Sequence, residues 1–235
     1  MERGRFIVFE GIDGAGKTTQ IDLLEKRLRE SGRRVYRTAE PTDSVTGGLL
    51  RDALSGVSKR TPCELAALFA LDRIHHNVNP VNGIEKMLAD GVDVICDRYY
   101  YSSLAYQGSE ISGDWVWNMN LDCPEIRRPD LCIFLDLTPE ESMARISRGR
   151  VTQEIYETRE RLEAVRNRFL EVFDRLGTRD AVITVNAARS IEDIHADIWN
   201  AYLTKSEEWG VSFRCRSRDL VLVGVRGYAR EPNRG

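Results

Sequence analysis

The chain has 235 residues, enough for one sizeable domain, and we treat it as a single core domain. Hydrophobic residues make up 42% and charged residues 30%, proportions close to globular averages, which argue against wholesale disorder. The formal net charge of −3 argues against a generic nucleic-acid binder, and no apolar run reaches the roughly 18 residues of a membrane span. We therefore expect a folded domain that is not exported and has neither nucleic acid nor membrane as partner.

The chain contains five scattered cysteines: Cys63, Cys96, Cys123, Cys132 and Cys215. Their number is odd and no C-x-x-C pair occurs, so neither a disulfide framework nor a zinc site is indicated. Cys96 and Cys132 lie inside apolar runs, where a cysteine acts as a small buried hydrophobe. Reduced thiols of this kind fit a cytoplasmic protein.

Short apolar runs alternate with helical stretches along the chain. The runs are Phe6–Phe9, Val35–Tyr36, Val92–Cys96, Leu131–Leu135 and Ala181–Val185. Such alternation predicts a parallel sheet that is covered by helices, which is an α/β fold.

Helix signals occur between these runs. Thr61 and Thr138 are each followed by Pro and, three residues on, by Glu, which predicts a helix start at both places. From Ile155 to Leu176 the apolar residues recur at three-, four- and seven-residue spacings, typical of a long amphipathic helix. We expect the core domain to span 1–205, and the strand-like runs of 206–235 suggest an appended β-hairpin.

A phosphate-binding motif follows the first apolar run. Residues 11–18 match G-x-x-x-x-G-K-[ST], in which backbone N–H groups wrap phosphate oxygens at the start of a helix. Lys17 should reach the β- and γ-phosphates of ATP, and the Thr18 hydroxyl should ligate Mg²⁺. The predicted phosphate cradle is therefore Gly11, Ile12, Asp13, Gly14, Ala15, Gly16, Lys17 and Thr18.

This loop alone is compatible with kinases, GTPase switches and nucleic-acid motor ATPases. Residues that could bind a phosphoryl acceptor are needed to distinguish these classes. Asp97 and Arg98 directly follow the third run, and ligands of parallel sheets bind beyond the carboxyl ends of strands. On the helix that starts at Thr61, Phe69 and Arg73 are one turn apart and could grip a base. An ordinary amphipathic helix with a core Phe and a solvated Arg explains this last pair equally well.

Taken together, these segments resemble the thymidylate kinase family of P-loop nucleoside monophosphate kinases, in spacing and order, from about residue 5 to 203. The matching stretches are 6–20, Glu40-Pro41-Thr42, 68–73, 97–108, 129–131, 135–136 and 165–166. The stretch D-R-Y-x-x-S-S-x-A-Y-Q-G at 97–108 is the most specific of them. The resemblance implies a P-loop NTPase-type parallel five-stranded sheet with a small helical lid at about 146–156.

The resemblance also implies an activity, the ATP-dependent phosphorylation of dTMP to dTDP for dTTP biosynthesis, by a homodimer. It implies that Phe69 stacks on thymine, that Arg73 hydrogen-bonds a base carbonyl and that Ser103 faces the base. The remaining roles that it implies are acceptor-phosphate clamps at Arg51 and Arg98, a sugar pocket at Tyr106 and Gln107, and a carboxylate near sugar, phosphates and metal at Asp13. We also expect Asp97 to contact Mg²⁺, directly or through water.

Arginines after the helix that starts at Thr138 are candidates for a lid over ATP. Some family members carry an arginine inside the phosphate loop, where this chain has Gly14, so the resemblance implies that the lid supplies it. We favour Arg148 or Arg150 as the catalytic arginine over Arg145. The chain departs from the family pattern at Ala39, where arginine is frequent, and at Arg161, which is commonly aromatic.

Two other hypotheses remain. A related kinase for another pyrimidine nucleotide or a deoxynucleoside would keep the same loop and differ around Ser103 and Tyr106. A P-loop switch or nucleic-acid ATPase would lack a phosphoryl acceptor, but the chain has neither an N-K-x-D guanine motif nor a basic surplus.

Overall fold

The computed structural model describes residues 3–149 and 158–209. Arg150, most of the predicted lid, and the predicted hairpin from residue 210 onward lie outside these described residues, as does Cys215.

A five-stranded parallel sheet forms the centre of the fold, as predicted. The strands are β1 (Phe6–Glu10), β2 (Val35–Ala39), β3 (Asp93–Asp97), β4 (Leu131–Asp136) and β5 (Val182–Asn186), in the order β2-β3-β1-β4-β5. The three inner strands are buried almost throughout, which explains why they read as continuous apolar runs. Because all strands are parallel, their carboxyl ends meet at one edge of the sheet, the edge at which β1 runs into the phosphate loop.

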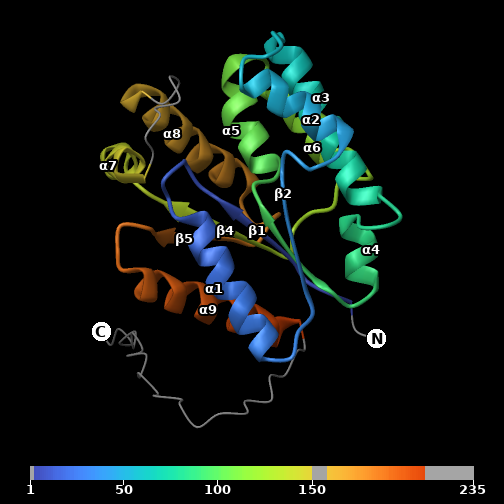
Figure 1. Cartoon of the computed structure of the whole chain (residues 1–235), viewed down its shortest axis with the longest axis vertical. Helices are drawn as coiled ribbons and strands as arrows, with labels where there is room; N and C mark the ends of the chain where they lie inside the picture. The colour runs from blue at the N-terminus through green and yellow to red at the C-terminus, as the bar shows by residue number, and fades with distance from the viewer. Residues whose placement is uncertain (1–2, 150–157, 210–235) are drawn as a thin grey trace, which may run out of the picture.

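Helices cover both faces of this sheet (Figure 1). On one face α1 (Lys17–Glu30) and α9 (Ile191–Glu208) lie side by side. On the other, α5 (Tyr100–Glu110) packs against α3 (Pro62–Val78), α6 (Gly113–Leu121) and α8 (Arg159–Leu176). The remaining described helices are α2 (Val45–Leu54), α4 (Ile84–Ala89) and α7 (Pro139–Gly149). Within the described ranges, none of the helices has the length and apolar character needed to cross a membrane.

The helix starts predicted at the two threonines are confirmed. Thr61 accepts a hydrogen bond from the backbone N–H of Glu64 at 3.2 Å, and the Glu64 carboxylate accepts one from the N–H of Thr61 at 2.8 Å. Thr138 likewise accepts from the N–H of Glu141 at the start of α7. Each cap satisfies a backbone donor that the first turn of a helix leaves without a partner.

Two boundaries differ from the sequence-based expectation. The long amphipathic helix begins at Arg159 rather than Ile155, because Thr158 is extended and its side chain caps the N–H of Arg161. At the other end, α9 continues to Glu208 and so crosses the boundary placed between 205 and 206, with Ser206 buried.

Candidate active site

The phosphate loop joins β1 to α1 and curls around its own lysine. Its glycines adopt positive φ, with Gly14 at 75° and Gly16 at 89°, conformations that L side chains disfavour. The Lys17 ammonium is buried and donates to the carbonyl oxygens of Gly11 at 3.1 Å and Ile12 at 3.4 Å. Burial, together with the nearby charge of Arg98, lowers the pKa of Lys17 to about 8, so most of its charge is kept at neutral pH.

Arg98 lies at the end of β3, next to the phosphate loop. Its φ of 65° is unusual for a bulky residue and is held by a hydrogen bond from its N–H to the carbonyl of Phe9, at 2.9 Å. Its guanidinium donates to Asp13 at 2.6 Å and to the Ser102 hydroxyl at 3.1 Å, and lies 5.6 Å from the ring centre of Tyr106. The acceptor-side arginine and the loop carboxylate therefore meet, although they are 85 residues apart in the chain.

A cavity of about 550 Å³ opens beside this arginine. It collects seven of the predicted site residues: Asp13, Phe69, Arg73, Arg98, Ser103, Tyr106 and Gln107. Apolar residues from α2, α3 and α8 complete the wall, among them Leu54, Leu65 and Leu162. An apolar slot with a few convergent polar groups and a cationic end is suited to a nucleotide base, sugar and phosphate.

Arg73 is fully buried in the wall of the cavity. It donates to Glu40 at 2.8 Å and to Ser103 at 3.2 Å, and also to the side-chain carbonyl of Asn120. His76 contacts the second Glu40 oxygen at 3.0 Å. These partners compensate a guanidinium that would otherwise be costly to bury, and they fix its direction.

Sequence reasoning missed Glu40, His76 and Asn120 as parts of this site. Glu40 stands in one of the stretches that carry the resemblance, but the spacing alone assigned it no role. Asn120 lies 47 residues from Arg73, and only the packing of α6 against α3 brings the two together. Sequence reasoning also missed Asp72, the residue before Arg73, which holds the loop before α2 through hydrogen bonds.

Asp72 accepts four hydrogen bonds from that loop and the first turn of α2, from the N–H and hydroxyl of Thr42 and the hydroxyls of Ser44 and Thr46, at 2.6–3.0 Å. Burial alone would raise the pKa of Asp72, but these donors hold it below its usual value. The Arg51 guanidinium donates to the carbonyls of Pro41 and Thr42 instead of lining the cavity. The sequence predicted Arg51 as a phosphate clamp, but in the structure its side chain lies beside the cavity and does not line it.

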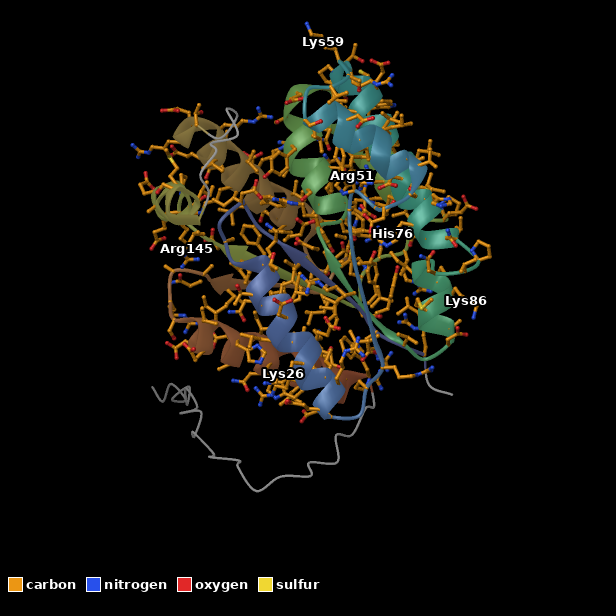
Figure 2. The ribbon with its side chains drawn as sticks, in the orientation of Figure 1. Lys26, Arg51, Lys59, His76, Lys86 and Arg145 are labelled. Atoms are coloured by element: carbon orange, nitrogen blue, oxygen red, sulfur yellow. The ribbon has the colours of Figure 1, made fainter. Side chains whose placement is uncertain are left out.

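The helix α7 is docked onto the phosphate loop. The Ser142 hydroxyl donates to the carbonyl of Asp13 at 2.7 Å, and Arg145 donates to the carbonyls of Gly14 at 3.3 Å and Ala187 at 2.7 Å. Figure 2 shows Arg145 on the α7 side of the site and Arg51 on the α2 side. Arg145 thus joins α7 to the loop, and Arg148 belongs to the last turn of the same helix.

The oxygen ligands at this edge fit Mg²⁺. The Oδ1 atom of Asp97 is buried, and within the described part of the chain it has no hydrogen-bond partner. Thr18 is exposed in the first turn of α1. A magnesium ion that keeps its waters and binds substrate phosphates needs only one or two such protein ligands, whereas the described residues hold no cluster of three or more His, Cys, Asp or Glu.

A parallel sheet, a phosphate loop at the carboxyl end of its central strand and a cavity that faces the loop across an arginine define a P-loop nucleotide kinase. The family profile described as "Thymidylate kinase" matches residues 9–198. The chain belongs to the thymidylate kinase family.

Individual relatives support this assignment. A "Probable thymidylate kinase" of Pyrococcus horikoshii is 43% identical over 203 residues, which cover 83% of this chain and 94% of the relative. The protein of the same description from Methanothermobacter thermautotrophicus is 43% identical over 82% of this chain and 91% of the relative. That of Methanocaldococcus jannaschii is 34% identical over 82% and 93%.

Because α7 packs against the phosphate loop, we expect a side chain at Gly14 to disturb the loop. A Cβ at this position would lie 3.0 Å from the Ser142 carbonyl oxygen, whereas a Cβ at Gly32, which also has positive φ, meets nothing within 4 Å. Gly32→Ala should therefore cost only the conformational term, about 1 kcal/mol. Gly14→Ala should cost more and weaken ATP binding about tenfold or more, because the loop amides shift. Urea unfolding measures the loss of stability in each variant, and calorimetric titration measures its ATP affinity. Equal losses in Gly14→Ala and Gly32→Ala would contradict the predicted effect of the contact with Ser142.

Proposed function

We propose that this protein transfers the terminal phosphoryl group of ATP to dTMP, which yields dTDP and supplies dTTP biosynthesis. The observation that carries the proposal is the cavity lined by Phe69, Arg73, Ser103 and Arg98, in which Arg98 is bound to Asp13 of the phosphate loop. We further propose the cytoplasm as its compartment, which the free thiols of the described cysteines support.

On the donor side, the loop amides and the positive end of α1 would hold the ATP phosphates. Lys17, which now donates to two loop carbonyls, would exchange them for the more strongly attracting β- and γ-phosphate oxygens. Thr18 and Asp97 would hold Mg²⁺, which when bound neutralises phosphate charge. The buried, unpartnered oxygen of Asp97 supports this assignment.

On the acceptor side, no general base is needed. The second pKa of a phosphate monoester is near 6, so dTMP is mostly a dianion at neutral pH and is itself the nucleophile. What must be overcome is the repulsion between two anions, and Arg98 would hold the dTMP phosphate against it. Asp13, which now binds this arginine, would face the acceptor sugar and phosphates.

The base and sugar would occupy the apolar part of the cavity. Phe69 would stack on thymine, and Arg73 would donate to a base carbonyl with the direction that Glu40 and Asn120 impose. Tyr106 and Gln107 would close around the sugar. In the described structure the buried Oε1 atom of Gln107 has no partner, which supports a ligand-facing role.

The lid would come from the end of α7. Arg148 or Arg150 would swing over ATP, stabilise the transferred phosphoryl group and exclude water. Arg145 is held by Gly14 and Ala187, which favours a role in fixing the base of the lid. Arg51, which binds the Thr42 carbonyl, would reach the acceptor phosphate only after that bond is broken.

We also propose a homodimer. The family resemblance implies one, and the packed pair of α2 and α3 supports it through exposed apolar side chains. On α2, Val45 and Leu49 are exposed and lie one turn apart. On α3, Leu71 and Val78 are exposed and lie two turns apart. Hydrophobic side chains at helical spacing are suited to a second copy of the same surface.

An acceptor panel tests the function. With Mg²⁺-ATP and a coupled assay, we expect dTMP to be phosphorylated in preference to dUMP, UMP, CMP and AMP. Arg73 offers donors to a pyrimidine carbonyl, Tyr106 would crowd a ribose 2′-hydroxyl, and the apolar cavity wall favours the thymine methyl group that dUMP lacks. Chelation of Mg²⁺ should abolish turnover. Preference for another acceptor would overturn the base assignment, and nucleotide-dependent partner binding without any product would favour a switch.

Arg98 should be the most sensitive residue of the acceptor side. We expect Arg98→Ala to lower turnover roughly 100-fold or more, the effect of removing one preorganised donor to a developing charge. The exposed Arg29 of α1, which pairs with Glu25, provides the control, and Arg29→Ala should stay within about twofold of the wild type. Steady-state kinetics with varied dTMP measure both, and a loss below tenfold in Arg98→Ala would contradict the role.

The dimer has its own test. The double substitution Leu71→Lys and Val78→Lys should shift the protein from dimer to monomer in sedimentation velocity, because it puts two like charges into a symmetric apolar contact. Ile191→Lys, at the start of α9, changes an equally exposed apolar residue and should leave the dimer intact. A wild-type monomer, or a double variant that sediments unchanged, would refute the proposed face.

A further inference from the structure

Glu10 is a carboxylate with no exposed surface in the middle of the fold. It is the last residue of β1 and stands directly before the first glycine of the phosphate loop. Its hydrogen-bond partners are the N–H of Tyr99 at 2.8 Å, the N–H of Ser102 at 3.2 Å and the hydroxyl of Ser102 at 2.7 Å. All of them belong to the segment that follows Arg98.

The first two bonds make Glu10 the N-terminal cap of a helix in another part of the chain. The residue at the cap position of α5, Tyr99, makes no cap hydrogen bond with its own side chain. The Oε1 atom of Glu10 accepts from the cap residue and from the third residue of the helix, the donors that a capping box satisfies. The negative charge also lies at the positive end of the helix dipole, where it is favourable.

The third bond reaches Arg98. An ionised carboxylate can only accept, so the hydroxyl of Ser102 must direct its hydrogen to Glu10. That leaves a Ser102 lone pair for the Arg98 guanidinium, which donates to it at 3.1 Å. Meanwhile the left-handed backbone of Arg98 is held between two bonds to β1, its own N–H to Phe9 and the next N–H to Glu10.

We propose that Glu10 is a positioning residue for the reaction, which through Ser102 and the first turn of α5 aims Arg98 at the phosphate loop. Because Glu10 is covalently joined to that loop, one side chain keeps the donor cradle and the acceptor clamp in register. The proposal rests on the proposed function only in naming dTMP as the ligand of Arg98.

The pKa of Glu10 distinguishes a role in positioning Arg98 from a role in stabilising the fold. Burial raises the pKa of Glu10 to about 7, although the charges of Arg98 and of Lys17 work against the rise. The folded-state pKa is thus above the unfolded value of 4.5, so the stability from this group is present below pH 4.5 and is lost as the pH rises through 7. Glu10→Gln should therefore unfold at the same or a higher temperature than the wild type at pH 8.

The same substitution should disturb the arginine. Glutamine keeps an acceptor for the two backbone donors, but its amide N–H₂ would face the Ser102 hydroxyl and compete with Arg98 for the oxygen lone pairs. Ser102→Ala removes the link to Arg98 and leaves the backbone bonds to Glu10 intact. The two variants should therefore share one kinetic defect.

The experiment compares wild type, Glu10→Gln, Ser102→Ala and a control, Glu25→Gln on α1, as full-length proteins. We expect the first two variants to lower kcat/KM for dTMP about 10- to 100-fold, with calorimetric ATP affinity within twofold of wild type and the melting temperature of Glu10→Gln not reduced at pH 8. The control should match the wild type in all three.

Wild-type kcat/KM in Glu10→Gln, or equal losses of dTMP affinity, ATP affinity and melting temperature, would overturn the positioning role. If the wild type instead prefers an acceptor other than dTMP, the proposed function fails. The same comparison with that acceptor then still decides the role of Glu10.

Discussion

The structure depends on placing cationic side chains at one edge of a parallel sheet before any anion arrives. Lys17 and Arg73 are buried and Arg98 is partly buried, and a buried charge without partners is costly. Each has protein acceptors: carbonyl oxygens for Lys17, Asp13 for Arg98 and Glu40 for Arg73. Each of these cations is thus held in place by protein acceptors at the edge of the sheet where the phosphate loop lies.

These pairs differ in how easily a substrate can replace them. The Arg73–Glu40 pair is almost completely removed from water, with a third partner in His76, so separating it would expose an unpaired buried charge. The Arg98–Asp13 pair is partly open, with 21% and 39% of the two side chains exposed. The Arg73–Glu40 pair is therefore a fixed part of the cavity wall, whereas the more exposed Arg98–Asp13 pair can exchange its internal contact for a ligand.

The sequence was sufficient for whatever depends on local pattern. Apolar runs located the five strands to within a few residues, glycine spacing located the phosphate loop, and the one-turn spacing of Phe69 and Arg73 brought both to the cavity. The sequence was insufficient for side-chain partners that tertiary packing determines. Nothing in the neighbourhood of Asn120 indicates a partner in α3, and nothing near Arg51 indicates that its guanidinium binds the Thr42 carbonyl. The start of α8 was missed because the apolar periodicity outweighed the cap at Thr158.

Several locally unfavourable features of the described residues lie at this same edge of the sheet. Arg98 has a left-handed backbone, which costs an L residue about 1–2 kcal/mol. Gly14 and Gly16 have positive φ in the adjacent loop, and Glu10 is a carboxyl group without exposed surface. Such features persist only where surrounding structure over-determines them, and here the buried strands β1, β3 and β4 supply that rigidity. Stability built in the centre of the sheet thus sustains strain at its edge, where the two nucleotides would meet.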